Sequence, residues 1–117
     1  MAERVIRIGD KDVPFKATAS TPRRYRERFN SDLFADINRI IPKSGALTFE
    51  DLGCVENMIY IMAKQADPTI PDDPDEWLDS FEMMPFYEIL PQILELWGMN
   101  IETLEKPKKK VNRQSAR

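Results

Sequence analysis

The sequence contains no histidine and only one cysteine, Cys54. Without histidine the chain has neither a Ser-His-Asp nor a Cys-His nucleophile system, and it lacks the ligand set of nearly all zinc sites. A single cysteine has no partner for a disulfide within the chain, so we expect a reducing, cytoplasmic environment. These absences lead us to predict that the protein is not an enzyme.

Glycine is scarce and long apolar runs are missing. The 117 residues include four glycines, which form neither a GxGxxG nor a GxxxxGK[ST] motif, so we expect no nucleotide or other cofactor. No apolar run approaches the roughly 20 residues that span a bilayer, and the first residues lack the apolar stretch of a secretory signal. We therefore expect one soluble globular domain without membrane contact.

Basic residues are absent from one long stretch. Between Gln65 and Glu105 there are eleven acidic residues and no Lys or Arg, whereas residues 106–117 carry six basic residues and no acid. Prolines interrupt the acidic run and the glycine of an EF-hand loop is missing, so we predict a solvated loop and no metal site. An acidic body repels phosphate backbones, which argues against nucleic acid as the partner.

The N-terminal segment predicts a β-hairpin over about residues 4–17. Short alternating apolar positions flank the turn-forming sequence GDKD. Pro14 cannot donate to a strand ladder, so its strand should lie at an edge. A hairpin of this size must pack on helices to be stable.

The rest of the chain predicts helices. The first should begin at Thr21-Pro22 and end at Pro42, because apolar residues recur at helical spacing between them. The second should begin at Thr48, and it is apolar over so much of its surface that it must be central or covered by a partner. A short third helix is predicted over 74–82. The last should start near Pro85, meet a kink or division at Pro91 and stop at Gly98.

These elements predict a mainly α fold with a small N-terminal β-hairpin, that is, an α+β protein. We expect one compact, mostly helical domain over residues 1–104 and a flexible, disordered basic tail over residues 105–117. The tail resembles a nuclear-import signal, but lysine runs of this kind are more often solvated ends of a chain.

The stretch TPRRYRERFN, residues 21–30, places four arginines around one tyrosine. On a helical wheel Arg24 and Arg28 point away from the apolar face, and Arg28 can pair with Asp32. Arg26 projects near the middle of the apolar face, so it should meet an acid from the second half of the chain or cover a neighbouring element. We interpret the stretch as a helix start that docks on the acidic half. A surface for an acidic or amphipathic partner and a nucleic-acid contact stay open as alternatives.

Three apolar residues surround Pro85 in an element that looks too short to bury them. These are Met83, Met84 and Phe86, and we expect them to be exposed at a groove or an oligomer contact. Methionine adapts to irregular partners and is common on promiscuous binding surfaces. Together with Arg24, Arg26 and Arg28, they are the predicted partner-binding residues.

Several stretches resemble a known family. They are IRIGDKDVPFKATASTPRRYRERFNSDLFADI, DEWLDSFE and EILPQILELWGMNIETLEKPKKK. In pattern and order they resemble the tail assembly chaperones of long-tailed phages and prophages of Gram-positive bacteria, over nearly the whole chain.

The resemblance implies a non-enzymatic chaperone that coats the tape-measure protein, keeps it soluble and helps tail-tube subunits assemble around it. It also implies a protein of the host bacterial cytoplasm that is absent from the mature virion, and a longer frameshifted form that recruits the tail-tube protein. We expect a homo-oligomer. The alternative is a small nucleic-acid-binding phage regulator that uses the Arg-rich first helix and the basic tail.

Overall fold

The computed structural model describes residues 2–40 and 48–98. Within these ranges the protein is mainly α with an N-terminal antiparallel hairpin, which confirms the predicted fold class. The elements are β1 (Ala2–Ile8), β2 (Lys11–Ala17), α1 (Thr21–Phe29), α2 (Leu33–Ile40), α3 (Phe49–Ala66), α4 (Pro74–Leu78) and α5 (Phe86–Leu96). The predicted boundary near residue 104 and the predicted tail lie outside the described residues.

The hairpin turns more tightly than GDKD suggests. Only Gly9 and Asp10 form the turn, and Lys11 and Asp12 already belong to β2. Gly9 has a φ of 64°, a conformation that favours glycine. Because the turn has two residues, the pair of residues that flanks it is hydrogen-bonded. The next pair is not hydrogen-bonded, and the two kinds of pair alternate along the ladder from there.

The register explains how β2 tolerates a proline. Val5 lies opposite Pro14, at a non-hydrogen-bonded position of the ladder, so the missing N–H of Pro14 costs no bond to β1. Side chains alternate between the two faces of the hairpin, and one face is buried. The buried set comprises Ile6, Ile8, Val13, Phe15 and Ala17. Val5 belongs to the other face and is 61% exposed.

The single helix predicted from Thr21-Pro22 to Pro42 is wrong, because the chain forms two helices there. Asn30 adopts a left-handed conformation with φ 55° and ends α1, and its N–H donates to the carbonyl of Arg26. Asp32 then opens α2 by accepting the N–H of Ala35 at 2.9 Å. The apolar residues keep helical spacing across this break, which is why periodicity alone does not reveal it.

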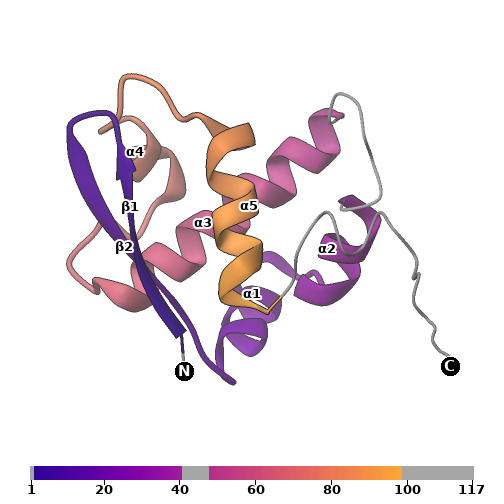
Figure 1. Cartoon of the computed structure of the whole chain (residues 1–117). Helices are drawn as coiled ribbons and strands as arrows, with labels where there is room; N and C mark the ends of the chain where they lie inside the picture. Colours follow the sequence, from indigo (N-terminus) through magenta and orange to yellow (C-terminus); the bar gives the residue numbers. More distant parts are fainter. Residues whose placement is uncertain (1, 41–47, 99–117) are drawn as a thin grey trace, which may run out of the picture.

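The helix α3 is the centre of the fold. Thr48 caps it as predicted, since its side chain accepts the N–H of Asp51 while the Asp51 carboxylate accepts the N–H of Thr48, both at 3.1 Å. It packs against β2, α1, α2, α4 and α5. Figure 1 shows it crossing the middle of the molecule, with the hairpin and α4 on one side and α1 and α2 on the other. Of the two predicted arrangements, the central one is therefore found.

The last two helices follow the prediction in part. The predicted third helix over 74–82 is too long: α4 ends at Leu78, because the N–H groups of Ser80 and Phe81 turn back to carbonyls three residues earlier. Pro91 lies inside α5 and does not divide it. Gly98 follows α5 with φ 71°, as expected of a helix stop. Within the described ranges, no helix has both the length and the apolar character needed to span a membrane.

Candidate partner-binding surface

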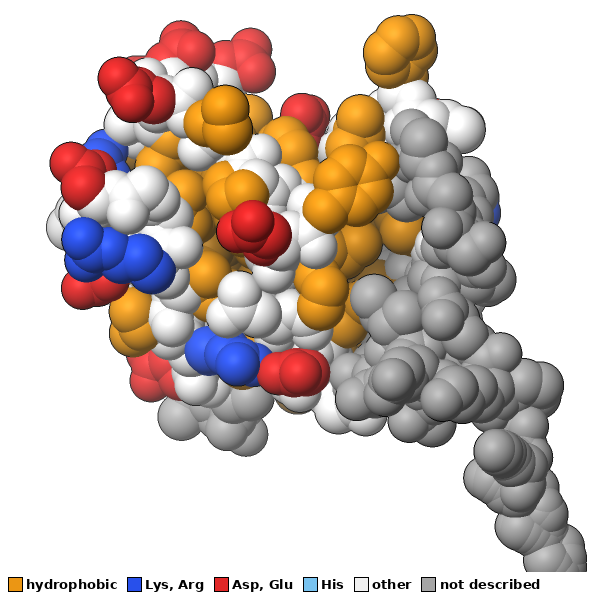
Figure 2. All heavy atoms as spheres, turned by 45° about the horizontal axis from the view of Figure 1, so that its top comes forward, with side chains coloured by type: hydrophobic (Ala, Val, Ile, Leu, Met, Phe, Trp, Pro, Cys, Tyr) orange, Lys and Arg blue, Asp and Glu red, His pale blue; other side chains and the backbone are white. Residues whose placement is uncertain are grey.

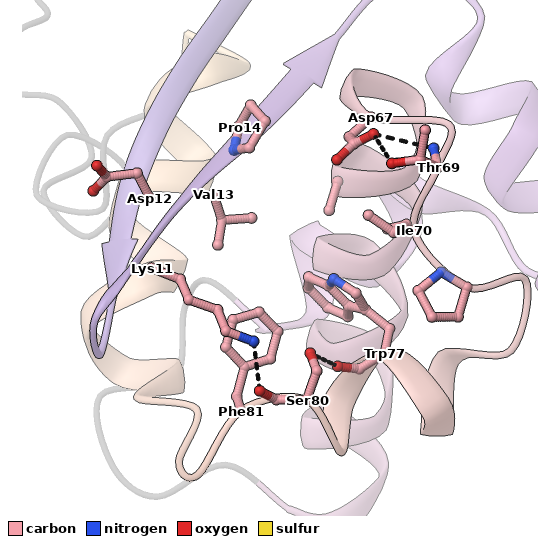
Figure 3. A pocket seen from close by; sticks show the side chains of 12 residues that line it. Lys11, Asp12, Val13, Pro14, Asp67, Thr69, Ile70, Trp77, Ser80 and Phe81 are labelled. Atoms are coloured by element: carbon pink, nitrogen blue, oxygen red, sulfur yellow. Dashed lines mark hydrogen bonds between the residues drawn. The ribbon is translucent and has the colours of Figure 1, made fainter.

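A cleft separates the hairpin from the segment that joins α3 to α4. Its volume is about 500 Å³. Val13 and Trp77 form its buried floor, and Pro14, Ile70 and Phe81 form half-buried walls. Figure 3 shows Val13 on β2 facing Ile70 and Trp77 across this space, while Asp12 points away from it.

The floor is held in place by aromatic packing and by hydrogen bonds. Trp77 is 3% exposed and packs edge-on against Tyr60 and Phe81, with ring centroids 5.8 and 5.2 Å apart. The Tyr60 hydroxyl donates to the carbonyl of Pro71 at 2.6 Å, which fixes the acidic loop against α3. The floor is therefore preformed and needs no partner to assemble.

Lys11 connects the two sides of the cleft. Its Nζ donates to the carbonyl of Ser80 at 2.6 Å and lies 4.7 Å from the centre of the Phe81 ring. The two residues are 69 positions apart in the sequence. No sequence signal identified this contact, because Lys11 was assigned to the turn and Ser80 to a helix.

A second hollow, of about 620 Å³, continues from the first through Lys11, Ser80 and Phe81. It runs along the turn of the hairpin towards Met83 and Pro85. We name the two hollows together the hairpin cleft. Across the middle of the face shown in Figure 2, hydrophobic side chains recur among the polar ones, and acidic side chains stand around them.

The three apolar residues predicted around Pro85 differ in exposure. Met83 is 77% exposed and lines the hairpin cleft, as expected of a partner contact. Met84 and Phe86 are half-buried and pack against the core, so the structure corrects the expectation that both are freely exposed. The helix α5 begins at Phe86 and lies against β1 and α3, which gives these side chains a place to pack.

The predicted arginines do not gather at the hairpin cleft. The Arg24 Nε donates to the hydroxyl of Ser20 at 3.2 Å. Arg28 donates to the carbonyl of Asp72, and its guanidinium carbon lies 5.8 Å from the centre of the Tyr60 ring. This contact joins the first helix to the acidic loop, in the way that the docking interpretation predicts. The predicted pair of Arg28 with Asp32 is wrong, since Asp32 caps α2 instead.

The prediction for Arg26 is also wrong. The side chain is exposed, and among the described residues it makes no hydrogen bond or ion pair. The reason is the early end of α1, whose buried residues are Thr21 and Tyr25. Arg26 therefore does not lie on a long apolar face, because that face is interrupted at Asn30.

A second cluster, which joins α1, α2 and α3, is polar and buried. The Asp36 carboxylate accepts hydrogen bonds from the hydroxyls of Tyr25 and Ser31, both at 2.7 Å, and from Arg39 at 3.1 Å. Arg39 also reaches the sulfur of Cys54 at 3.1 Å and lies 3.6 Å from the buried Asp51 carboxylate. We name this cluster the polar junction.

The ionisable groups of the polar junction form hydrogen bonds with one another. Burial opposes ionisation of Asp36, but its hydrogen bonds, that from Tyr25 foremost, outweigh burial and keep the pKa of the carboxyl below its ordinary value. Burial, and then the hydrogen bond to Asp36, raises the pKa of the Tyr25 hydroxyl. Burial also raises the pKa of the Cys54 thiol, which disfavours the reactive thiolate. The cluster is suited to fixing three helices together.

One further apolar hollow lies between the end of β2 and α5. It has a volume of about 440 Å³ and is lined in part by Phe34 and Trp97, whose rings meet edge-on at 5.4 Å. The indole N–H of Trp97 is buried without a hydrogen-bond partner among the residues that the structure describes. The sequence analysis assigned Trp97 to the last helix and did not predict its contact with Phe34.

Comparisons with protein-family models, with curated proteins and with solved structures each found no match for this chain. The candidate surface therefore rests on the chain's own geometry and on the resemblance described from its sequence.

Proposed function

We propose that this protein is a phage tail assembly chaperone. In this role it binds the tape-measure protein, keeps it soluble and assists assembly of the tail tube, without catalysing a reaction. The proposal starts from the resemblance of the stretches IRIGDKDVPFKATASTPRRYRERFNSDLFADI and EILPQILELWGMNIETLEKPKKK to that family.

The observation that carries the proposal is the hairpin cleft with Met83 at its border. A preformed cleft lined in part by apolar side chains suits a protein that holds apolar segments of a larger client. Met83 is 77% exposed, and a flexible thioether can pack against client segments of different shape. A chaperone for a long helical protein needs this tolerance, because it must bind many similar segments.

Burial of the floor supports the same role. Val13 and Trp77 remain packed against the core without a client, so the free protein needs no large rearrangement before binding. The chaperone would act in the host bacterial cytoplasm as a homo-oligomer and would be absent from the mature virion. A longer frameshifted form would contact the tail-tube protein.

Co-expression tests the proposal directly. The tape-measure protein should be largely insoluble when it is produced alone and soluble when this chain is produced with it. The two proteins should then elute together in size-exclusion chromatography. An unrelated acidic helical protein of similar size, produced at the same level, provides the control for a general effect of co-expression.

The proposal fails if the tape-measure protein stays insoluble and no complex forms while this chain is folded. The alternative regulator makes the opposite prediction: tight binding to duplex DNA that weakens steeply with salt, with a slope of about −0.9 per phosphate contacted. A complex held by apolar contacts should depend much less on salt.

A further inference from the structure

We propose that the hairpin cleft binds amphipathic helical segments whose apolar face is flanked by lysine or arginine. This inference rests on the proposed chaperone function and names the chemistry of the client segment. The sequence resemblance supplies neither the binding site nor the charge of the client, and both follow from the described residues.

The cleft has the shape and lining that an apolar helix face requires. Its two hollows of about 500 and 620 Å³ share Lys11, Ser80 and Phe81, so they lie next to each other with the contact between Lys11 and Ser80 at their common border. Apolar side chains occur along its whole length, from Val13 and Ile70 at one end to Met83 at the other. A helix presents side chains three and four positions apart on one face, and such a row fits an elongated apolar depression.

A helix fits better than an added strand. The outer edge of β2 borders the cleft, and its outward-facing residues are Asp12, Pro14 and Lys16. Pro14 stands in the middle of that edge and has no N–H to give to a neighbouring strand. Because strand addition depends on main-chain hydrogen bonds, this edge is a poor template, and recognition must use side chains.

The charges around the cleft select the client. Asp10, Asp12, Asp67 and Glu82 line it, and Lys11 is the only basic residue among its described lining residues. Lys11 keeps its positive charge, because its Nζ contacts a neutral carbonyl and an aromatic ring, but it stands against four acidic residues. Asp12 points away from the cleft and is paired with Arg7 at 3.0 Å. The carboxylates of Asp10 and Glu82 make no hydrogen bond or ion pair with any other described residue.

The surroundings strengthen the negative field. From Gln65 to Gly98 the described chain has nine acidic residues and no Lys or Arg. Exposed carboxylates of α4 and its flanks, such as Asp75 and Asp79, therefore add to the potential at the cleft. A client helix with acidic flanks would meet like charges, whereas basic flanks would be attracted.

Two synthetic peptides test the inference. Both are amphipathic helices of about 18 residues, or five turns, with the same Leu and Ala face, and they differ only in having lysine or glutamate flanks. Binding is followed by the fluorescence of Trp77 in a Trp97→Phe background. This background should fold, because it removes an indole N–H that has no partner among the described residues. The lysine peptide should bind at least about tenfold more tightly at low salt, and added salt should reduce the difference.

Matched variants locate the binding site. Met83→Asp should weaken binding of the lysine peptide at least about tenfold, since it puts a charge on the apolar wall. Phe49→Asp, at the first position of α3 and 95% exposed, should leave binding unchanged. Glu82→Lys should reduce the preference for lysine flanks, whereas Glu88→Lys, which makes the same change in net charge outside the cleft lining, should not. Thermal melting identifies any variant that has lost its fold.

Several outcomes would overturn the inference. These are equal binding of the two peptides, full binding by folded Met83→Asp, or a change in oligomeric state instead of peptide affinity, which would make a second copy the occupant. The test is separate from that of the chaperone function. If wild type and folded Met83→Asp both solubilise the tape-measure protein, the function stands and the cleft is not the site. If peptides bind as predicted and the tape-measure protein stays insoluble, the function falls.

Discussion

The polar junction and the hairpin cleft lie on different sides of α3 and differ in how they satisfy their groups. In the polar junction, Asp36 is 4% exposed and accepts three hydrogen bonds from side chains. In the hairpin cleft, Met83 is 77% exposed, and the Asp10 and Glu82 carboxylates stand beside apolar side chains without a hydrogen bond or ion pair to any other described residue. In the polar junction the polar groups already contact one another, whereas in the hairpin cleft apolar and acidic side chains remain available to a partner. The comparison separates residues that stabilise the fold from those that we propose bind a client.

The largest effect on stability should come from Asp36→Ala. The change removes the acceptor of the Tyr25 and Ser31 hydroxyls and leaves a buried phenol without a partner. We expect a loss of about 3 kcal/mol in the free energy of unfolding, measured by urea denaturation. Asp12→Ala, in the exposed pair with Arg7, is the control and should cost less than about 0.5 kcal/mol. Similar losses for the two variants would remove the distinction between the regions.

Acid should act on the same junction. The pKa of Asp36 is lowered in the folded state, so its contribution is fully present above the unfolded value of about 3.9 and is lost as the pH falls through the folded value. Below about pH 4, the free energy of unfolding should fall by up to about 1.4 kcal/mol per pH unit through the Asp36 carboxylate. Asp67 and Asp72 act in the same direction, because their pKa values are also lowered.

Asp36→Asn measures how much the Asp36 carboxyl contributes to the loss of stability in acid. The variant should show a shallower loss of stability below pH 4 than wild type, measured by denaturation at a series of pH values. An unchanged slope would mean that Asp36 does not differ in protonation between the folded and unfolded states, contrary to its burial and its hydrogen bonds.

The turn at Asn30 should give a smaller effect. Alanine tolerates the observed φ of 55° less well than asparagine, so Asn30→Ala should cost about 1 kcal/mol. Asn30→Gly should be close to neutral, since glycine adopts positive φ without strain. Thermal denaturation of the two variants tests whether this conformation, and not a contact of the side chain, divides α1 from α2. Equal losses in both would indicate the contact.

Met83→Asp should have the smallest effect on stability and a large one on binding. Because Met83 is 77% exposed, the change should alter the free energy of unfolding by less than about 0.5 kcal/mol. Soluble tape-measure protein in co-expression should nevertheless decrease. Met84→Asp provides the contrast: Met84 packs against the core, so its loss should appear in stability as well.

The sequence was sufficient to predict the fold class, the hairpin and the start of α3 at Thr48, because these follow from local alternation, turn residues and acidic residues in the first turn of a helix. It failed where a few backbone torsions override a regular pattern. The break at Asn30 keeps the helical spacing of Tyr25, Phe29 and Leu33 in phase, so the apolar residues looked like one stripe.

The candidate binding surface was harder to predict than the fold. Met83 was identified because exposed apolar residues beside a proline are locally visible. The hairpin cleft was not identified, because it forms only where β2 meets the segment after α3. The hydrogen bond across it joins Lys11 to Ser80. Contacts between residues this far apart in the sequence depend on packing of the whole chain, and no local pattern in residues 1–20 predicts them.

The hydrogen bond between Lys11 and Ser80 has a consequence for how the chain folds during its synthesis. The hairpin leaves the ribosome well before Ser80 and Phe81 do, and Glu95, the partner of Arg4, emerges later still. In a nascent chain α3 can already pack against β2, but the part of the hairpin's apolar face that α5 covers stays open until α5 has been made. The hairpin cleft therefore forms late in synthesis. A chain that is still being made should be unable to bind a client before its own core is packed.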